Sequence, residues 1–198
     1  MTKYSGDILP NWLLRLTDTH PLSDELREHL LNSFEIKSYS KKEILLRPGQ
    51  VSNHACFILK GLVRAYYISD EGQDITSRIM DENFLITSWI SFYTRKPTDE
   101  YIQTLEDTVL SCIHYDNLEK LYNNYPDFNI LGRKLIEHFL YLAEQRTRLL
   151  RKHTAEEKYR LFLQQHPELL QRVPLHYIAT YLGMSEETLS RIRSKKTH

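Results

Sequence analysis

The residues between positions 174 and 193 combine the apolar spacing of two packed helices with polar side chains that could contact DNA. The small Ala179 and, four residues later, Gly183 suit the turn between two short helices that cross at a steep angle. Ser185 is placed to cap the second helix, because its hydroxyl can accept a hydrogen bond from a backbone N–H of the first turn. The apolar residues that can hold the second helix on the first are Ile178, Leu182, Met184, Leu189 and Ile192. These features predict a helix-turn-helix in the last ~25 residues, a length typical of that motif.

The polar side chains on the outer face of the second helix are of the types that bind DNA. Hydroxyl, carboxylate and guanidinium groups can hydrogen-bond to base edges, and Lys and Arg side chains hold phosphates. The predicted DNA-binding residues are Ser185, Glu186, Glu187, Thr188, Ser190, Arg191, Arg193, Lys195 and Lys196. The alternative is an ordinary helical hairpin with a solvated polar face.

The charge of the chain is unevenly distributed. The whole chain contains 26 Lys and Arg and 26 Asp and Glu, for a formal net charge of +0. Residues 146–198 contain 11 of the basic and 5 of the acidic residues, which gives this part +6 and leaves −6 for residues 1–145. A basic C-terminal part favours an anionic partner such as double-stranded DNA.

A long helical segment precedes these two helices. Between Asp127 and His153 there is no Pro and only one Gly, and apolar residues recur every seven positions. Such spacing is typical of the seam of a parallel coiled-coil dimer. The predicted dimer interface consists of Phe128, Leu135, Phe139, Leu142 and Leu149. The alternative is one long helix that packs against the β domain of its own chain.

The first part of the chain is predicted to be a β-roll that follows a helical lead-in. Residues 8–34 carry apolar side chains at helical spacing, with Ser23 placed as a cap. Between Glu35 and about Ile113, short β-branched and aromatic runs alternate with turn residues at roughly the 8 to 12 residue interval of an all-β sandwich or barrel. Asp116, with Glu119 three residues later, has the pattern of a capping box that begins another helix.

Four stretches of the sequence together resemble the Crp/Fnr family of homodimeric bacterial regulators. They are ILLRPGQ at 44–50, FILKGLVR at 57–64, TAEEKY at 154–159 and ETLSR at 187–191, and the resemblance covers nearly the whole chain. It implies base contacts by Glu187 and Arg191, with Ser190 near the DNA backbone. It also implies a homodimer and RNA polymerase as a partner. Many family members have a basic residue where this chain has Glu186, so the target sequence is expected to differ from a familiar one.

The predicted fold class is therefore α+β, with an N-terminal jelly-roll-like β-roll as sensor domain, a long dimerisation helix and a C-terminal helix-turn-helix. The predicted domains are residues 1–126, 127–153 and 154–198. The last boundary depends on Thr154 and Glu157, which can form a capping box at the start of a new helix.

The effector is not evident from the sequence. Nucleotide-binding members of the family hold the ribose with a Gly-Glu pair and the cyclic phosphate with an Arg-Ser or Arg-Thr pair, and residues 86–101 contain neither. Asp99 and Glu100 lie near the expected phosphate position, where like charges would repel it. The aromatic residues Trp89, Tyr93 and Tyr101, together with Phe92, predict either a filled core or the lining of a pocket for an unknown small-molecule effector, and a filled core is favoured.

No sequence motif indicates catalysis, a metal site or a cofactor. Cys56 and Cys112 are far apart and are interpreted as buried thiols rather than as a disulfide or an iron–sulfur site. His54, His114 and His138 lack the spacing of metal ligands. A cupin-type metal-dependent enzyme built on the β-roll is the alternative to a regulator. Because no stretch approaches the ~18 apolar residues of a membrane span and no signal peptide is evident, we expect a cytoplasmic protein without membrane contact.

Overall fold

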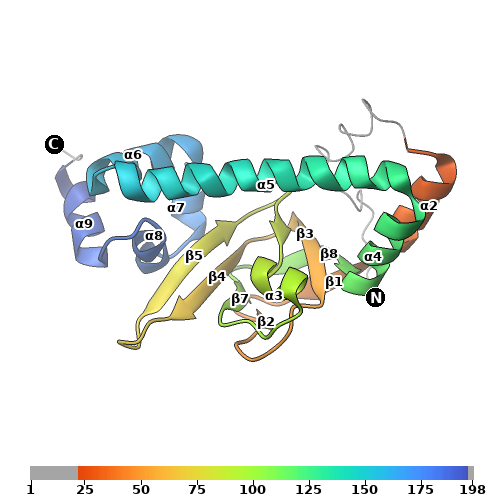
Figure 1. The fold of residues 1–198 in the computed structure, drawn as a ribbon. Coiled ribbons are helices and arrows are strands. Elements are labelled where there is room, and N and C mark those ends of the chain that lie inside the picture. Colours follow the sequence, from red (N-terminus) through yellow and green to blue (C-terminus); the bar gives the residue numbers. More distant parts are fainter. Residues whose placement is uncertain (1–21, 196–198) are drawn as a thin grey trace. The chain divides into compact units, whose positions relative to one another are not determined.

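The computed structural model describes residues 22–195, which form two compact units. Among these residues, unit 1 consists of 22–63 and 80–138, and unit 2 of 64–79 and 139–195. The sequence-based boundaries at residues 126 and 153 divide the chain differently, and they stay a prediction. The predicted α+β class is confirmed, since an antiparallel β structure is followed by a series of helices (Figure 1).

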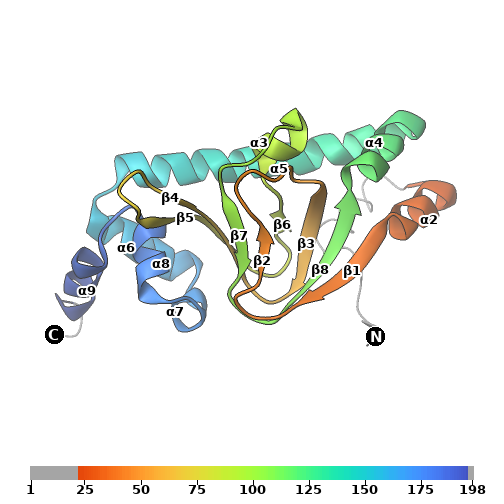
Figure 2. The ribbon, with the colours of Figure 1, turned by 90° about the horizontal axis from the view of Figure 1, so that it is seen from below.

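A four-stranded antiparallel sheet is the centre of unit 1. Its strands have the order β1-β8-β3-β6, and Figure 2 shows β1, β8 and β3 side by side. Their side chains are mostly apolar or β-branched on the buried face, as expected for a sheet that covers a core. The bounds are β1 (Phe34–Tyr39), β3 (His54–Lys60), β6 (Leu85–Ile86) and β8 (Thr108–His114).

Two further strands of unit 1, β2 (Ile44–Leu46) and β7 (Tyr101–Thr104), pair antiparallel with an irregularity between Ile44 and Leu46. The short helix α3 (Trp89–Thr94) connects β6 to β7. It ends at Arg95, which has a left-handed backbone conformation with φ of 58°. The strands predicted between Glu35 and Ile113 are thus present.

Cys56 and Cys112 form a disulfide, which corrects the prediction of two buried thiols. Both residues are buried, with exposed fractions of 7% and 2%, so the burial was predicted correctly and the bonding state was not. The two residues lie directly opposite each other in the β3–β8 register, with their Cα atoms 4.0 Å apart. Because the two residues are 56 positions apart, local sequence patterns do not indicate that their strands are neighbours.

Three helices complete the described part of unit 1: α2 (Asp24–Asn32), α4 (Tyr115–Asn124) and the beginning of α5 (Pro126–Lys152). Ser23 caps α2 as predicted, since its hydroxyl accepts a hydrogen bond from the N–H of Leu26. Helix α4 starts one residue before the predicted Asp116, and its cap is His114, whose Nδ1 accepts from the N–H of Asp116. The expected capping box of Asp116 and Glu119 is therefore wrong, because the imidazole already occupies that role. The lead-in residues before position 22 lie outside the described residues.

Unit 2 contains a β-hairpin and the C-terminal helices. The hairpin strands are β4 (Val63–Ile68) and β5 (Asp74–Met80), joined by a turn in which Gly72 has a φ of 79°. Thr154 and Glu157 form the predicted capping box at the start of α6. The helices after α5 are α6 (Ala155–Gln165), α7 (Leu169–Arg172), α8 (Leu175–Tyr181) and α9 (Glu186–Lys195). Within the described part of the chain, none of the helices is both long and apolar enough for a membrane span.

Candidate nucleic-acid interface

Helices α8 and α9 form the helix-turn-helix that the sequence predicts. The turn contains Gly183 with a φ of 64°, a left-handed conformation that glycine adopts without strain. It is closed by hydrogen bonds from the N–H of Gly183 to the carbonyl of Thr180 and from the N–H of Met184 to the carbonyl of Ala179, both 3.0 Å long. Pro174 is the N-cap of α8, and the helix begins at Leu175.

Most of the apolar residues predicted for this motif form its core, whereas Met184 is only partly buried. Ala179 is completely buried, so the two helix backbones can come close at that point. The side chains of Ile178, Leu182 and Leu189 are also completely buried, and Ile192 is 8% exposed. Helix α9 packs against both α8 and α6, which fixes the direction of its outer face.

The predicted DNA-binding residues fall into two groups. Ser185 and Thr188 belong to the helix cap: the Ser185 hydroxyl accepts from the N–H of Thr188 at 3.2 Å and donates to its hydroxyl at 3.0 Å. The exposed residues on the outer face of α9 are Glu186, Glu187, Ser190, Arg191, Arg193 and Lys195. The structure therefore brings most of the predicted contact residues together on one helix face. Lys196 lies outside the described residues.

The acidic and basic side chains of α9 lie at opposite ends of the helix. Glu186 and Glu187 are in its first turn, and Arg193 and Lys195 are in its last turn. This arrangement stabilises the helix, because carboxylates are favourable at the N-terminus of the helix dipole and cations at the C-terminus. It also leaves the basic side chains at one end of the exposed face, where phosphate groups could be held.

Helix α8 is attached to the β4–β5 hairpin by a contact that sequence reasoning missed. The guanidinium carbon of Arg64 lies 3.5 Å from the centre of the Tyr177 ring and 3.8 Å from the centre of the Tyr66 ring. The two Nη atoms of Arg64 donate to the two carboxylate oxygens of Asp74 at 2.7 and 2.8 Å. The charge is thus both stacked and paired, which is how an Arg that is only 2% exposed can be accommodated.

A backbone hydrogen bond adds to this attachment. The N–H of Thr76 in β5 donates to the hydroxyl of Thr180 in α8, at 3.1 Å. The Thr180 hydroxyl also donates to the carbonyl of Tyr177, at 3.3 Å. The first helix of the motif is therefore held by a strand edge as well as by the apolar core.

Arg146 of α5 makes a second contact with the end of α8. Its guanidinium carbon lies 3.6 Å from the centre of the Tyr181 ring, and Nη2 donates to the carbonyl of Tyr181. Its Nε and Nη1 are buried without a hydrogen-bond partner among the described residues. Burial lowers the pKa of Arg146, because the charged form is poorly solvated.

The residues predicted for a dimer seam do not lie on the most exposed face of α5. Phe128 is 5% exposed and packs on Tyr122 within unit 1, with ring centres 4.9 Å apart. The others, Leu135, Phe139, Leu142 and Leu149, are partly buried in the single chain. The exposed apolar side chains are instead Ile136, Leu140 and Tyr141, with exposed fractions of 37%, 69% and 60%.

The aromatic residues considered for an effector pocket are not all brought together. Trp89, Phe92 and Tyr93 line an apolar cavity of about 50 Å³ in unit 1, whereas Tyr101 on β7 does not line it. The rings of Trp89 and Tyr93 are stacked with centres 6.1 Å apart. A space of this size holds only one or two water molecules, so these residues do not enclose a ligand-sized pocket, and Tyr93 is 49% exposed.

The described residues contain no group of three or more His, Cys, Asp or Glu side chains that could hold a metal ion. His54 and His114 are neighbours across β3 and β8, with ring centres 5.1 Å apart. His138, the third histidine considered from the sequence, is exposed on α5 and does not join them in such a group.

Comparisons with known proteins agree with this architecture. Residues 36–125 match the model of the cyclic nucleotide-binding domain family. FixK2 from Bradyrhizobium japonicum is similar in structure, with a TM-score of 0.69, 21% identity and coverage of 82% of this chain and 83% of that one. A CooA variant from Carboxydothermus hydrogenoformans has a TM-score of 0.62 and 23% identity, covering 92% of this chain and 83% of that one. No curated protein sequence matches the chain significantly.

A further similar structure, from Eubacterium rectale, is described as a regulator of the Crp/Fnr family. Its TM-score is 0.67 at 17% identity, and the match covers 97% of this chain and 88% of that one. The chain has the Crp/Fnr fold. The fold that the sequence resemblance implies is thereby confirmed. In this Crp/Fnr fold, the matched range runs along the chain from β1 to α4, and α8 and α9 follow at the C-terminal end.

Proposed function

We propose that the chain is a DNA-binding transcription regulator that acts as a homodimer on an inverted-repeat operator. The observation that carries this proposal is the outer face of α9, where Glu187, Ser190 and Arg191 are exposed while Leu189 and Ile192 are buried. A helix of this kind can enter the major groove with its polar residues facing base edges. The similarity to Crp/Fnr regulators supports the same function, and by that resemblance RNA polymerase is a further partner.

The roles of the α9 residues follow from their chemistry. Arg191 has five N–H donors in a planar group and can bind the O6 and N7 atoms of guanine together. Glu187 can accept a hydrogen bond from the amino group of cytosine. Arg193 and Lys195 lie at the end of the helix, where they can hold phosphates without reading sequence.

A homodimer would use the exposed apolar side of α5. Ile136, Leu140, Ala143 and Thr147 are spaced by four, three and four residues, so they lie on one stripe of the helix. We propose this stripe as the centre of the interface, with the predicted Leu135, Phe139, Leu142 and Leu149 beneath it in the same chain. Two-fold symmetry then places the two α9 helices on half-sites about 34 to 36 Å apart, one turn of the duplex.

The proposed regulator does not use a cyclic nucleotide. The hydroxyls of Ser88 and Thr98 are buried and hydrogen-bond to each other at 2.9 Å. The one Arg of residues 86–101, Arg95, donates to the backbone carbonyls of Ser52 and Phe92, at 2.9 and 3.1 Å. Arg95 and the two hydroxyls already have partners, so they are not free to hold a cyclic phosphate.

Selection from a pool of random duplex DNA, followed by binding titration, tests the proposal. We expect enrichment of an inverted repeat, loss of binding in Arg191→Glu and unchanged binding in Lys120→Glu. The second variant is the matched control, because it makes the same charge reversal at an exposed position on α4. If the wild-type chain enriches no sequence and binds DNA no better than Arg191→Glu does, the proposed function is wrong.

A further inference from the structure

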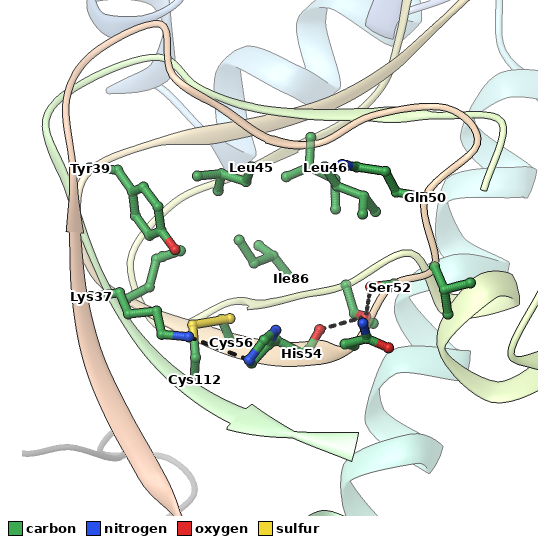
Figure 3. Close-up of a pocket in the computed structure, with 15 residues that line it drawn as sticks. Lys37, Tyr39, Leu45, Leu46, Gln50, Ser52, His54, Cys56, Ile86 and Cys112 are labelled. Atoms are coloured by element: carbon green, nitrogen blue, oxygen red, sulfur yellow. Dashed lines mark hydrogen bonds between the residues drawn. A yellow bond between two sulfur atoms is a disulfide. The ribbon is translucent and has the colours of Figure 1, made fainter. Parts of the chain in front are cut away.

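A cavity of about 530 Å³ lies within the β structure of unit 1 (Figure 3). Figure 3 shows Leu45 and Leu46 facing Cys56 and His54 across it. The apolar part of its wall is formed by Leu45, Leu46, Ile86, Ile102, Leu110 and the Cys56–Cys112 disulfide. Its volume falls in the range of about 300 to 1,000 Å³ that is usual for small-molecule sites.

One end of this cavity is positively charged. Lys37 on β1 and His54 on β3 both line it, and Lys37 Nζ lies 3.4 Å from His54 Nε2. No Asp or Glu is among the lining residues. The nearest carboxylate partner of Lys37 is Glu35, at 3.2 Å, but the side chain of Glu35 is 73% exposed and does not line the cavity. Inside the cavity the ammonium group therefore contacts only a neutral acceptor, the His54 ring, while its carboxylate partner lies on the solvent side.

The hydroxyl groups at the other end of the cavity are already satisfied. Ser52 Oγ and Thr87 Oγ1 hydrogen-bond to each other at 3.0 Å, and Thr87 Oγ1 donates to the carbonyl of His54 at 3.0 Å. By contrast, the hydroxyl of Tyr39 points toward the end where Lys37 lies, as Figure 3 shows. Lys37 and Tyr39 thus place two donors for a ligand at the same end of the cavity.

We propose that this cavity binds a small amphiphilic carboxylate, a molecule with one carboxylate group and an apolar body. The carboxylate would take hydrogen bonds from Lys37 Nζ, the His54 ring and the Tyr39 hydroxyl. The apolar body would contact Leu45, Leu46 and the other apolar side chains of the wall. A neutral apolar molecule would leave the Lys37 ammonium without an anionic partner inside the cavity.

Proton uptake by His54 should accompany binding. An ammonium group can only donate, so the contact with Lys37 requires an unprotonated Nε2 on His54. Burial lowers the pKa of His54, and Lys37 and His114 lower it further, while Glu35 acts in the opposite direction. A bound carboxylate would favour the imidazolium form and raise this pKa. Affinity for the carboxylate should therefore increase as the pH falls toward 6 and decrease as the pH rises, as long as the ligand stays ionised.

Isothermal titration calorimetry of the full chain with octanoate and with 1-octanol tests this site without DNA. We expect octanoate to bind at least ten times more tightly than 1-octanol. Lys37→Met should reduce octanoate affinity at least tenfold and leave 1-octanol affinity within twofold. The matched control is Lys41→Met, which removes the same charge from an exposed residue that does not line the cavity, and it should change neither affinity by more than twofold.

Two further variants keep the test decisive. His54→Gln should abolish the pH dependence of octanoate binding, and Leu45→Trp should fill the cavity and reduce the affinity for both ligands. Equal binding of octanoate and 1-octanol with no effect of Lys37→Met would show an apolar cavity only and would overturn the proposal. No heat of binding from octanoate at millimolar concentration to the folded wild-type chain would overturn it as well. Because no DNA is present, neither result depends on the proposed regulatory function.

Discussion

The guanidinium group of Arg64 lies 3.5 Å above the ring of Tyr177, although the two residues come from a β-hairpin and from the first helix of the helix-turn-helix. Arg64 also forms a two-pronged ion pair with Asp74 of the same hairpin. Unit 2 is therefore held together by a buried cation as well as by its apolar core. This contact joins the hairpin to α8, beside the hydrogen bond between Thr76 and Thr180.

Replacement of Arg64 should destabilise unit 2 strongly. In Arg64→Met the Asp74 carboxylate loses its partner, and removal of one member of a buried pair typically costs about 3 to 5 kcal/mol. Because Asp74 is 34% exposed and can be partly hydrated, we expect the lower end of this range, about 3 kcal/mol. Chemical denaturation, followed by the fluorescence of the tyrosines, measures the change in unfolding free energy.

Arg133→Met is the control for this variant. Arg133 is 68% exposed and pairs with Glu137 at 3.8 Å, so its loss should cost less than about 1 kcal/mol. If the two variants lose similar amounts of unfolding free energy, the buried, stacked ion pair of Arg64 contributes no more stability than an exposed ion pair. Amide hydrogen exchange in α8 should also become faster in Arg64→Met and not in Arg133→Met.

The dimer proposal makes a prediction about Leu140, which is 69% exposed in the single chain. Leu140→Lys should convert a dimer into a monomer at micromolar concentration, because a charge would be placed at the centre of an apolar seam. Light scattering coupled to size-exclusion chromatography measures the mass. Gln145→Lys, an exposed position on a different side of α5, should remain a dimer. A wild-type monomer, or a Leu140→Lys dimer, would contradict the proposal.

The disulfide between Cys56 and Cys112 predicts a specific chemical behaviour. Alkylation of the unfolded but unreduced chain should modify no cysteine, and prior reduction should expose both, as intact mass would show. Reduction should lower the unfolding free energy by about 2 to 4 kcal/mol, since the bond closes a loop of 56 residues. A chain with Cys56→Ala and Cys112→Ala should not respond to reductant. Modification of two cysteines without reduction would show that the thiols are free.

Cyclic AMP and cyclic GMP should have no effect on thermal stability. A ligand present at 100 times its dissociation constant adds about 2.7 kcal/mol to the stability of the folded state, which is easily seen as a rise in Tm. We expect no rise at millimolar concentrations. A clear increase with either nucleotide would mean that Arg95 or another cation leaves its present partners to bind the cyclic phosphate.

Local patterns were reliable guides to this structure. The capping box of Thr154 and Glu157 and the turn at Gly183 depend on residues that are close in the sequence, so their geometry could be predicted. The cap of α4 shows the limit of such rules, since His114 replaced the expected Asp116 by using its ring nitrogen.

Long-range pairings could not be predicted in the same way. Cys56 and Cys112 meet only because β3 and β8 are neighbours in one register, and Arg64 meets Tyr177 only after the hairpin packs on α8. On α5 the spacing of apolar residues is compatible with two stripes, one through Phe128 and Leu142 and one through Ile136 and Leu140. Phe128 is buried and Leu142 is partly buried, so the second stripe is the exposed one. One pattern in the sequence could have pointed to Lys37 as a cavity residue. Lys37 and Tyr39 are two residues apart in β1, so their side chains lie on the same face of the strand, and both are partly buried.

Replacement of the exposed residues of α9 should weaken DNA binding in two distinguishable ways. Arg191→Ala should cost about 1 to 3 kcal/mol on the selected operator and relax the preference at one base pair in each half-site, because a bidentate contact to guanine is lost. Lys195→Ala should weaken binding to operator and scrambled DNA alike, and it should reduce the slope of log affinity against log salt concentration by about one, because one phosphate contact is lost. Titrations of the wild type and both variants on the two DNAs at several salt concentrations separate these effects. If Arg191→Ala lowers the affinity for both DNAs equally, Arg191 contacts a phosphate and does not read a base. The DNA sequence must then be read by other residues of α9, and Glu187 and Ser190 are the next residues to replace.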